Sequence, residues 1–438
     1  MKRSLYTLLA GIMLSFTCLI LSCQKGSNTS STNTTQTQPA NSTLPTITSL
    51  STTTGGYYTG VTITGTNFSA TAANNQVLFN GVAATVITAT ATQLTVSVPL
   101  AAGTGPVTVT VNSVKATGPV FTYQKTLAVT TVVGYGLPSN LMTGAGGATI
   151  GFNTSFACIA ADTAGNLYFS LPVQYLICKQ TPNGTITPYI GTYANNAAFN
   201  GTFAPISIIS YMPQYMAFDA SKNLYGTLGF TNIWQISNKG IFTNTFGGVF
   251  TPVSTSFGAS FETIGGMATD AAGDVYVSDF YNNVIRKITP GGIASIFAGS
   301  GKQGTADGAA ALATFYQPAN ITIDANGNLY VIDFGNNLIR KITPAGTVST
   351  LPVTTAQPTG ITVDNSNNIF IAEQGYIKQI TPAGQETIFA GVGASSAIFD
   401  GPVSIARFYA TGDITTDHHN NIYVLDENGN SIRKVGYQ

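Results

Sequence analysis

Residues 318–353 read PANITIDANGNLYVIDFGNNLIRKITPAGTVSTLPV, and this stretch decides the fold class. It contains four short apolar runs that are rich in β-branched side chains, a composition typical of strands. Turn sequences separate the runs, most clearly DANGN at 324–328 and TPAG at 343–346. Asn and Gly accept positive φ, and Asp bonds its own downstream backbone, so these segments reverse the chain. The stretch therefore predicts a four-stranded antiparallel meander.

The same unit recurs along the second part of the chain. Each copy opens its first turn with an aspartate, and the six are Asp162, Asp219, Asp270, Asp324, Asp364 and Asp417. An Asn or Asp follows four residues later, and an aromatic residue follows two residues after that. A single meander cannot bury both of its faces, whereas sheets stacked radially can. The recurrence predicts a six-bladed β-propeller.

The two ends of the repeat region predict how the ring closes. Residues 127–134 match the fourth runs of later copies, such as residues 294–299. The chain ends just after residues 431–435, which match third runs, so the last copy lacks a fourth strand. Pairing between these two segments would cover two exposed strand edges. We therefore expect the first segment to complete the last blade.

The repeats resemble the NHL family. The resemblance lies in NLYVID at 328–333 and in NVIRKI at 283–288 and NLIRKI at 337–342, each of the latter followed by Thr-Pro-x-Gly. It implies a six-bladed propeller. It also implies two enzymatic precedents, since some NHL-type lyases hold zinc with several His, and lactonase-type propellers hold calcium with central carboxylates and Asn.

Charge covaries among the repeats. Nine residues after each turn aspartate stand Leu171, Leu228, Asp279, Asp333, Glu373 and Asp426, and the matching third-run residues are Cys178, Trp234, Arg286, Arg340, Lys378 and Arg433. An acid is always matched by a cation, and Leu by Cys or Trp. Residues that change together are cross-strand neighbours. We interpret the charged sets as structural ion pairs rather than catalytic groups.

The N-terminus has the features of an export signal. Lys2 and Arg3 precede an apolar run over residues 5–21, and the run ends in LILSC at 19–23. This end resembles the lipobox of bacterial lipoproteins of the Bacteroidetes type, which implies cleavage and lipidation at Cys23. The resemblance predicts a signal peptide over 1–23 and outer-membrane attachment through lipid alone, on the periplasmic or the cell-surface side. Residues 24–44 are Ser, Thr, Asn and Gln with few apolar residues, which predicts a disordered tether.

Residues 45–124 predict a small sandwich. Alternation of apolar and polar residues is strong at 61–64, 94–98 and 107–111, with turns between. The segment resembles the IPT/TIG family of immunoglobulin-like domains in VTITGTNF at 61–68, VLFNG at 77–81 and FTY at 121–123. Lys115 is its only charged residue, so it lacks the groups for acid–base or metal chemistry. The predicted fold class is all-β, with this immunoglobulin-like sandwich followed by the propeller over 125–438.

Composition limits the functions open to the chain. Charged residues make up 8% of the sequence and the formal net charge is zero, which argues against a nucleic-acid partner. The only two histidines, His418 and His419, are adjacent in a turn and make a poor metal pair.

Asp307-Gly308 and Asp400-Gly401 recur in two loops and are interpreted as loop-shaping turns. Cys158 and Cys178, one strand apart, are expected to be free buried thiols because ~10 Å separates strands two positions apart. We predict no metal, no cofactor and no enzymatic activity.

Aromatic residues in the loops predict a binding face. One face of a propeller carries the long loops between blades together with the turns between second and third strands, and we call it the loop face. The opposite face, the turn face, carries short turns and is expected to offer few contacts. Aromatic side chains beside Asn suit a sugar or a peptide. The candidate ligand-binding residues are Tyr175, Tyr193, Tyr211, Phe230, Tyr281, Phe334 and Tyr376. Phe315 and Phe408 are expected to plug gaps between blades instead.

The sequence thus predicts a cell-envelope lipoprotein that acts as a non-catalytic binding or interaction protein. Its partner would be a glycan or a protein in the envelope. The alternative is an NHL-type lyase or hydrolase with a metal near the central channel, and a third possibility is a scaffold in an envelope complex.

Overall fold

The computed structural model describes residues 44–134, 142–143, 149–150, 156–172, 176–191, 213–228, 232–239, 242–246, 261 and 263–438. The elements in these residues are strands and two short 3₁₀ helices, η1 (Ala72–Asn74) and η3 (Phe334–Asn336). Among the described residues, no helix has the length and apolar character needed to cross a membrane. The all-β prediction is confirmed.

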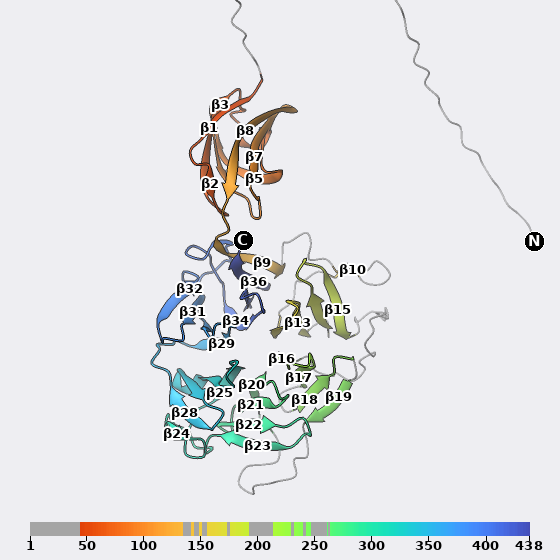
Figure 1. Cartoon of the computed structure of the whole chain (residues 1–438), viewed down its shortest axis with the longest axis vertical. Helices are drawn as coiled ribbons and strands as arrows, with labels where there is room; N and C mark the ends of the chain where they lie inside the picture. The colour runs from red at the N-terminus through yellow and green to blue at the C-terminus, as the bar shows by residue number, and fades with distance from the viewer. Residues whose placement is uncertain are drawn as a thin grey trace, which may run out of the picture. The chain divides into compact units, whose positions relative to one another are not determined.

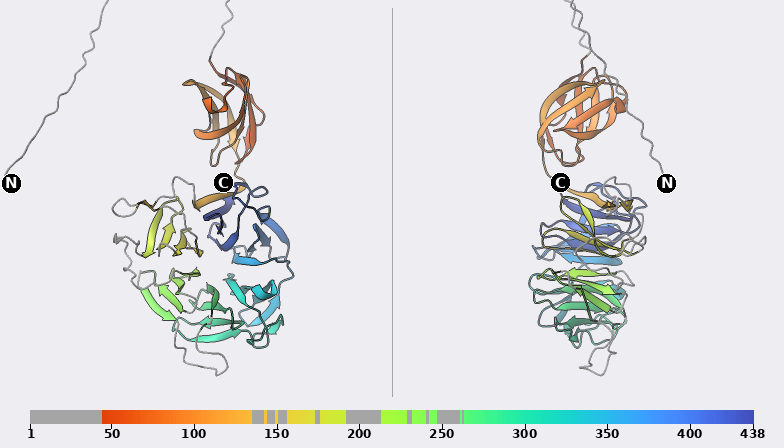
Figure 2. Two further views of the ribbon diagram at one scale, coloured as in Figure 1. Left: turned by 180° about the vertical axis from the view of Figure 1, so that it is seen from behind. Right: turned by 90° about the vertical axis from the view of Figure 1, so that its right-hand side faces the viewer.

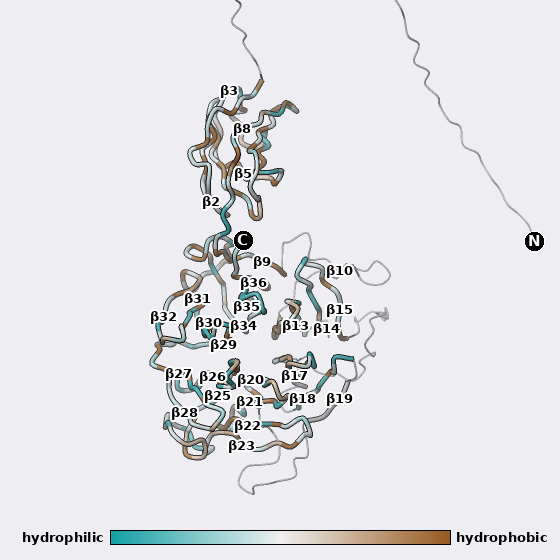
Figure 3. Tube along the Cα trace, in the orientation of Figure 1, coloured by the Kyte–Doolittle hydropathy of each residue, from teal (hydrophilic) through white to brown (hydrophobic). Residues whose placement is uncertain are grey.

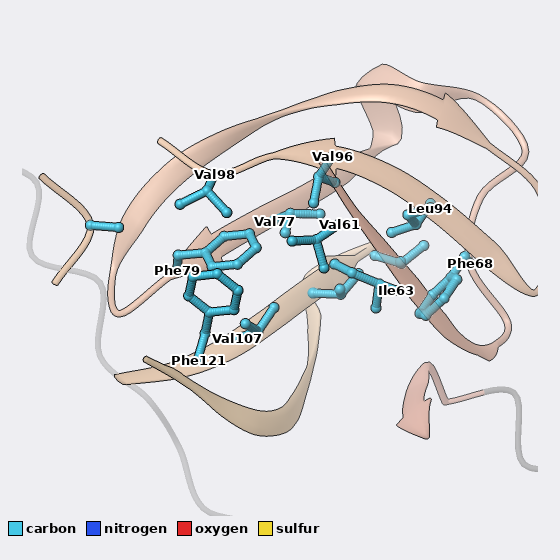
Figure 4. Close-up of a cluster of buried hydrophobic side chains, with 13 residues drawn as sticks. Val61, Ile63, Phe68, Val77, Phe79, Leu94, Val96, Val98, Val107 and Phe121 are labelled. Atoms are coloured by element: carbon cyan, nitrogen blue, oxygen red, sulfur yellow. The ribbon is translucent and has the colours of Figure 1, made fainter. Parts of the chain in front are cut away.

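The first domain is a sandwich with one hydrophobic core. Its strands are β1 (Thr46–Leu50), β2 (Thr54–Gly55), β3 (Gly60–Thr66), β4 (Asn75–Phe79), β5 (Val82–Ala89), β6 (Gln93–Ser97), β7 (Gly105–Val111) and β8 (Val114–Tyr123). Strand order is β1-β3-β6-β5-β4-β7-β8-β2. Alternate residues of these strands point inward, and Phe79 and Phe121 meet edge to face at 5.0 Å between ring centroids (Figure 4).

The six repeats form six antiparallel sheets around a common centre (Figure 1). Blade 1 is β12 (Ile159–Ala161), β13 (Leu167–Leu171), β14 (Leu176–Gln180) and β15 (Ile186–Gly191). Blade 2 is β16 (Met216–Phe218), β17 (Leu224–Leu228), β18 (Asn232–Ile236) and β19 (Phe242–Phe246). Blade 3 is β20 (Ile264–Thr269), β21 (Val275–Asp279), β22 (Val284–Ile288) and β23 (Ala294–Ala298).

Blades 4 to 6 each follow the same order, and two of them gain a short fifth strand. Blade 4 is β25 (Pro318–Ile323), β26 (Leu329–Asp333), β27 (Leu338–Ile342) and β28 (Thr347–Thr350), with β24 (Gly308–Ala309) at its edge. Blade 5 is β29 (Pro358–Val363), β30 (Ile369–Glu373), β31 (Tyr376–Ile380) and β32 (Glu386–Ala390). Blade 6 is β34 (Thr411–Thr416), β35 (Ile422–Asp426), β36 (Ser431–Tyr437) and β9 (Leu127–Gly134), with β33 (Gly401–Pro402) at its edge. The small strands β10 (Met142–Thr143) and β11 (Thr149–Ile150) pair with each other.

Packing between blades follows from the strand period of two. The two faces of each sheet bear apolar side chains, so a separate buried cluster lies between every neighbouring pair of blades. Hydrophobic residues are accordingly spread through the strands of all blades rather than gathered in one centre (Figure 3). The innermost strands contact one another in a closed circle, β12-β16-β20-β25-β29-β34 and back to β12. Figure 2 shows this ring from behind and edge-on.

The turn aspartates fix the first hairpin of each blade. In blade 4, Oδ1 of Asp324 accepts the N–H groups of Asn326 and Asn328 at 2.9 and 2.8 Å. Oδ2 accepts the Asn328 side chain at 2.8 Å and the Tyr330 hydroxyl at 3.1 Å. Equivalent contacts recur at Asp162 and Asp417. These carboxylates therefore act as hydrogen-bond acceptors within the turns, as the sequence predicts.

The predicted closure is confirmed. Strand β9 pairs antiparallel with β36 from Leu127↔Tyr437 to Gly134↔Ser431, with a bulge next to Arg433. Val129 of β9 is buried in the cluster between blades 5 and 6, and Val133 in the cluster between blades 6 and 1. The N-terminal segment of the propeller thus contributes both hydrogen bonds and core to the last blade.

The predicted ion pairs are present, and three of them include a further carboxylate, since Lys378 also contacts Glu386 at 3.1 Å. Asp279–Arg286 and Glu373–Lys378 lie at 2.6 Å, and Asp333–Arg340 and Asp426–Arg433 at 2.9 and 3.2 Å. The Arg340 guanidinium also contacts Asp307 at 2.8 Å, and that of Arg433 contacts Asp400 at 2.6 Å. The loop aspartates interpreted only as turn-shaping are therefore third members of ion networks.

Each loop aspartate also ties its network to the outer strand of its blade. Asp307 accepts the backbone N–H and the hydroxyl of Thr350, both at 3.0 Å. Asp400 accepts the same two groups of Thr131 on β9, at 2.8 and 3.0 Å. Phe315 and Phe408, both fully buried, lie under the guanidinium groups of Arg340 and Arg433, which confirms their predicted role as plugs.

Candidate functional site: the propeller hub

Six residues occupy equivalent positions around the central channel, each four residues before a turn aspartate. They are Cys158, Tyr215, Gly266, Asn320, Gly360 and Asp413. A Cβ on Gly266 would lie 2.8 Å from the Asn320 Cα, and one on Gly360 would lie 2.6 Å from the Gly412 carbonyl oxygen. The two glycines therefore let neighbouring innermost strands approach closely. The other four side chains supply the chemistry of this level, which we call the hub.

The hub has a cavity of about 180 Å³, lined by residues of all six innermost strands, with Tyr215, Asn320 and Asp413 among them. Asp413 is enclosed by protein and its remaining exposed surface faces this cavity. Its Oδ1 accepts the Asn320 side-chain N–H and its own successor's backbone N–H, each at 3.0 Å. Its Oδ2 accepts the backbone N–H of Ile159 at 3.0 Å, so one carboxylate bridges blades 6, 4 and 1.

The electrostatics of the hub are unusual for this chain. Burial raises the pKa of Asp413 to about 6, although the hydrogen bonds from Ile159 and Asn320 oppose the shift. Burial and the Asp426 carboxylate raise the pKa of Glu427, whose side chain lies beside Gly412 at the start of β34. Burial raises the pKa of the Tyr215 hydroxyl as well, and Asp413, Cys158 and Glu427 add to that shift. A perturbed carboxyl in a cavity marks a functional-site candidate.

The hub cysteine is not a nucleophile. Cys158 is fully buried, and its thiol donates to the Pro213 carbonyl at 3.3 Å and contacts the Ser170 hydroxyl at 3.4 Å. Burial, helped by Asp413, raises its thiol pKa well above the ordinary value, which suppresses the reactive thiolate. Neither Cys158 nor Cys178 forms a disulfide, and both are buried, as predicted.

The turns between second and third strands surround the loop-face mouth of the hub. The first residue of this turn is Phe280 in blade 3, Phe334 in blade 4, Gln374 in blade 5 and Glu427 in blade 6. The Phe280 ring packs over Gly265, which is at the start of β20 in the same blade. A Cβ added to Gly265 would lie 3.3 Å from this ring. The same ring is 5.0 Å from that of Tyr281 and 6.4 Å from that of Phe334. We call these three residues the aromatic cluster.

The structure places the predicted ligand-binding residues unevenly. Tyr281 and Phe334 come together in the aromatic cluster and remain 55% and 40% exposed. Tyr376 is half-buried, with its hydroxyl against Gly393. Tyr175, Tyr193, Tyr211, Phe230 and the lipidation candidate Cys23 lie outside the described residues. Whether any of them binds a ligand stays a prediction.

Two features were missed at the sequence level. The hub ring was not predicted, although listing the residue four positions before each turn aspartate would have found it. The turn face is also more hollowed than expected. A cavity of about 800 Å³ opens there, lined by the first turns of the blades and by His418. Among the described residues, no three His, Cys, Asp or Glu side chains gather in a metal-binding arrangement.

Replacing Asp413 should reveal the cost of its charge. The folded pKa of about 6 exceeds the ordinary value of 3.8, so the folded state holds the proton of Asp413 more tightly than the unfolded state does. The contribution of this group to the free energy of unfolding is therefore greatest below pH 4 and is lost as the pH rises through 6. The ionised carboxylate then lowers the free energy of unfolding by about 3 kcal/mol at most. Asp413→Asn should therefore raise the thermal midpoint at pH 8 and change it little at pH 4. A midpoint difference that is the same at both pH values would contradict this account.

Comparisons with known proteins bear on the domains and the fold. Residues 45–124 match the family model described as IPT/TIG domain. Protein SUPPRESSOR OF QUENCHING 1, chloroplastic, from Arabidopsis thaliana is 41% identical over 71 residues, which cover 16% of this chain and 7% of that protein. The chain thus spans a small part of the length of this curated relative.

Solved structures from Bacteroides have a similar fold over most of the chain. An auxiliary nutrient binding protein from Bacteroides thetaiotaomicron VPI-5482 has a TM-score of 0.59 at 16% identity, over 90% of this chain and 98% of that one. One from Bacteroides ovatus ATCC 8483 has a TM-score of 0.52 at 14% identity, over 90% and 98%. Virginiamycin B lyase from Staphylococcus aureus reaches 0.44 at 17% identity, over 71% and 99%. The TM-scores of the two Bacteroides structures show likeness of fold alone, and the chain joins an IPT/TIG domain to a six-bladed β-propeller.

Proposed function

We propose that this chain is a lipid-anchored protein of the outer membrane that binds a glycan or a protein ligand at the loop face of its propeller and catalyses no reaction. The observation that carries the proposal is the composition of the loop-face mouth. The aromatic cluster, in which Tyr281 and Phe334 are exposed, lies in the turns of blades 3 and 4, and Gln374 and Glu427 stand in the matching turns of blades 5 and 6. A mouth of this kind offers stacking and polar contacts to one ligand.

Two further points support binding over catalysis. The hub thiol is protonated and buried, and the described acids are mostly consumed as turn acceptors or ion-pair partners. The fold is shared with two nutrient binding proteins of Bacteroides.

The proposed lipid anchor rests on the lipobox-like LILSC at 19–23. Metabolic labelling with a palmitate analogue tests it, and label retained by Cys23→Ser would overturn it.

One observation favours a second function. Asp413 has a pKa of about 6 and lies in a cavity near a tyrosine hydroxyl, which are properties of a general base. An NHL-type lyase or hydrolase would use such a group. Product formation that Asp413→Asn abolishes while the protein stays folded would replace the binding proposal with this one.

Removing the aromatic cluster tests the proposed binding face. Tyr281→Ala and Phe334→Ala each remove a stacking surface worth about 1–2 kcal/mol, so we expect each to weaken ligand binding about five- to thirtyfold. A glycan array and a peptide library supply the ligands, and titration calorimetry supplies the affinities. Tyr437→Ala is the matched control, because Tyr437 is 70% exposed at the turn-face end of β36. A ligand bound equally by all three variants does not use this face.

A further inference from the structure

Two acids, Asp413 in the hub and Glu427 at its mouth, differ from all other described acids in their partners. Salt bridges or turn hydrogen bonds occupy the rest, as in the networks around Arg340 and Arg433. Asp413 and Glu427 have no ion pair with any cation in the described part of the chain. Two acids without a counterion therefore occur at one place, in and above the same channel.

A neutral side chain in the hub has unused hydrogen-bonding capacity. The Tyr215 ring lines the cavity, and its hydroxyl makes no hydrogen bond to any described residue. The backbone N–H of Tyr215 bonds the Thr227 hydroxyl at 3.3 Å, which fixes the start of β16. Tyr215 and Asp413 line the same cavity, so one bound group in it can contact both. Both can accept a hydrogen bond from a donor between them.

On these grounds, and resting on the proposed binding function, we infer that the hub recognises a protonated primary amine carried by the ligand. An ammonium group has three donors and one positive charge. It would pair with Asp413, donate to the Tyr215 hydroxyl and neutralise a channel where charge is weakly screened. Glu427 at the mouth would attract it, and the rest of the ligand would lie against the aromatic cluster.

The inference can be tested with a matched pair of small probes. 2-Phenylethylamine and 2-phenylethanol have nearly the same shape and differ in the ammonium group. Titration of the full chain should show saturable binding of the amine, with the alcohol at least tenfold weaker. Asp413→Asn and Tyr215→Phe should each weaken the amine at least tenfold. Asp274→Asn should not, because Asp274 pairs with Lys287 away from the hub. Binding should also fall below pH 6, where Asp413 becomes protonated.

The outcomes separate this inference from the proposed function. Equal affinity for amine and alcohol, or unchanged amine binding in folded Asp413→Asn, would overturn it. Saturable binding of calcium chloride that Asp413→Asn abolishes would also overturn it, in favour of a metal ion. If the amine probe fails while Tyr281→Ala still weakens a ligand from the arrays, only the amine assignment is lost. If the amine binds and the aromatic substitutions have no effect, the loop-face proposal is lost and the hub site remains.

Discussion

A chain that lacks residues 127–134 is expected to lose the folded propeller. The deletion removes β9, which pairs with β36 over its whole length and with β33 at its outer edge. Val129 and Val133 leave two separate inter-blade cores, and burying two valines contributes about 3–6 kcal/mol. The stability of a domain is about 5–15 kcal/mol in total, so the ladder and the core together account for a large part of it.

The ion network around Arg433 adds to this loss. Asp400 holds Thr131 of β9 and Arg433 of β36 at once, so it ties the first and the last strands of the propeller. Without β9, the edge of β36 is exposed and can pair with other chains. We expect aggregation and no cooperative thermal transition of the propeller. Circular dichroism and size-exclusion chromatography of the deleted chain measure both.

A second deletion serves as the control. A chain that begins at residue 125 lacks the IPT/TIG domain but keeps β9, and in the described strand pairings no strand of that domain joins a propeller sheet. It should keep the propeller transition. Adding a synthetic peptide of residues 127–134 to the damaged chain should restore part of the transition. An unchanged thermal midpoint in the chain without residues 127–134 would show that closure carries little of the stability.

The sequence allowed the periphery of each blade to be predicted well because the repeats provide their own alignment. Comparing six copies at one position identified the pair Asp333–Arg340 without coordinates. The same comparison found Leu228 and Trp234 at these positions of blade 2. The recurrence of Asp307 and Asp400 was recognised, but their place in the ion networks was missed, because a loop has no strand register that would set them opposite Arg340 and Arg433. The fully buried Phe315 and Phe408 were predicted correctly because their loops do share a local pattern.

The hub was harder to predict for a different reason. Its residues come from six copies and are of five different types, with glycine occurring twice, so no shared motif draws attention to them. What they have in common is their place four residues before a turn aspartate. The fold converts that place into proximity, because the innermost strands form a closed circle. The proposed hub site thus uses positions where the repeats stop being alike.

The second large effect is expected at Arg340. Its side chain is fully buried and its guanidinium contacts both Asp333 and Asp307. Burial raises the pKa of Asp333 despite hydrogen bonds from Asn336, Tyr316 and Arg340. Burial also acts on Asp307, but there the bonds from Arg340 and Thr350 outweigh it and the pKa lies below its ordinary value. Arg340→Met keeps an apolar stem against Phe315 and leaves a buried carboxylate without its cation, so it should cost about 3–5 kcal/mol.

A double substitution distinguishes the cost of lost contacts from the cost of a buried carboxylate without its cation. In the unaltered protein the Tyr316 N–H donates to the Asp333 carboxylate at 2.7 Å. Asp333→Asn/Arg340→Met removes the buried charge and keeps an amide oxygen as acceptor for this N–H. We expect it to cost less than Arg340→Met alone, because blade 2 is built with the uncharged pair Leu228 and Trp234 at these positions. Urea unfolding at pH 7.5 measures both costs. If the double variant is the less stable of the two, the penalty comes from lost hydrogen bonds and packing, and the uncompensated carboxylate is not its cause.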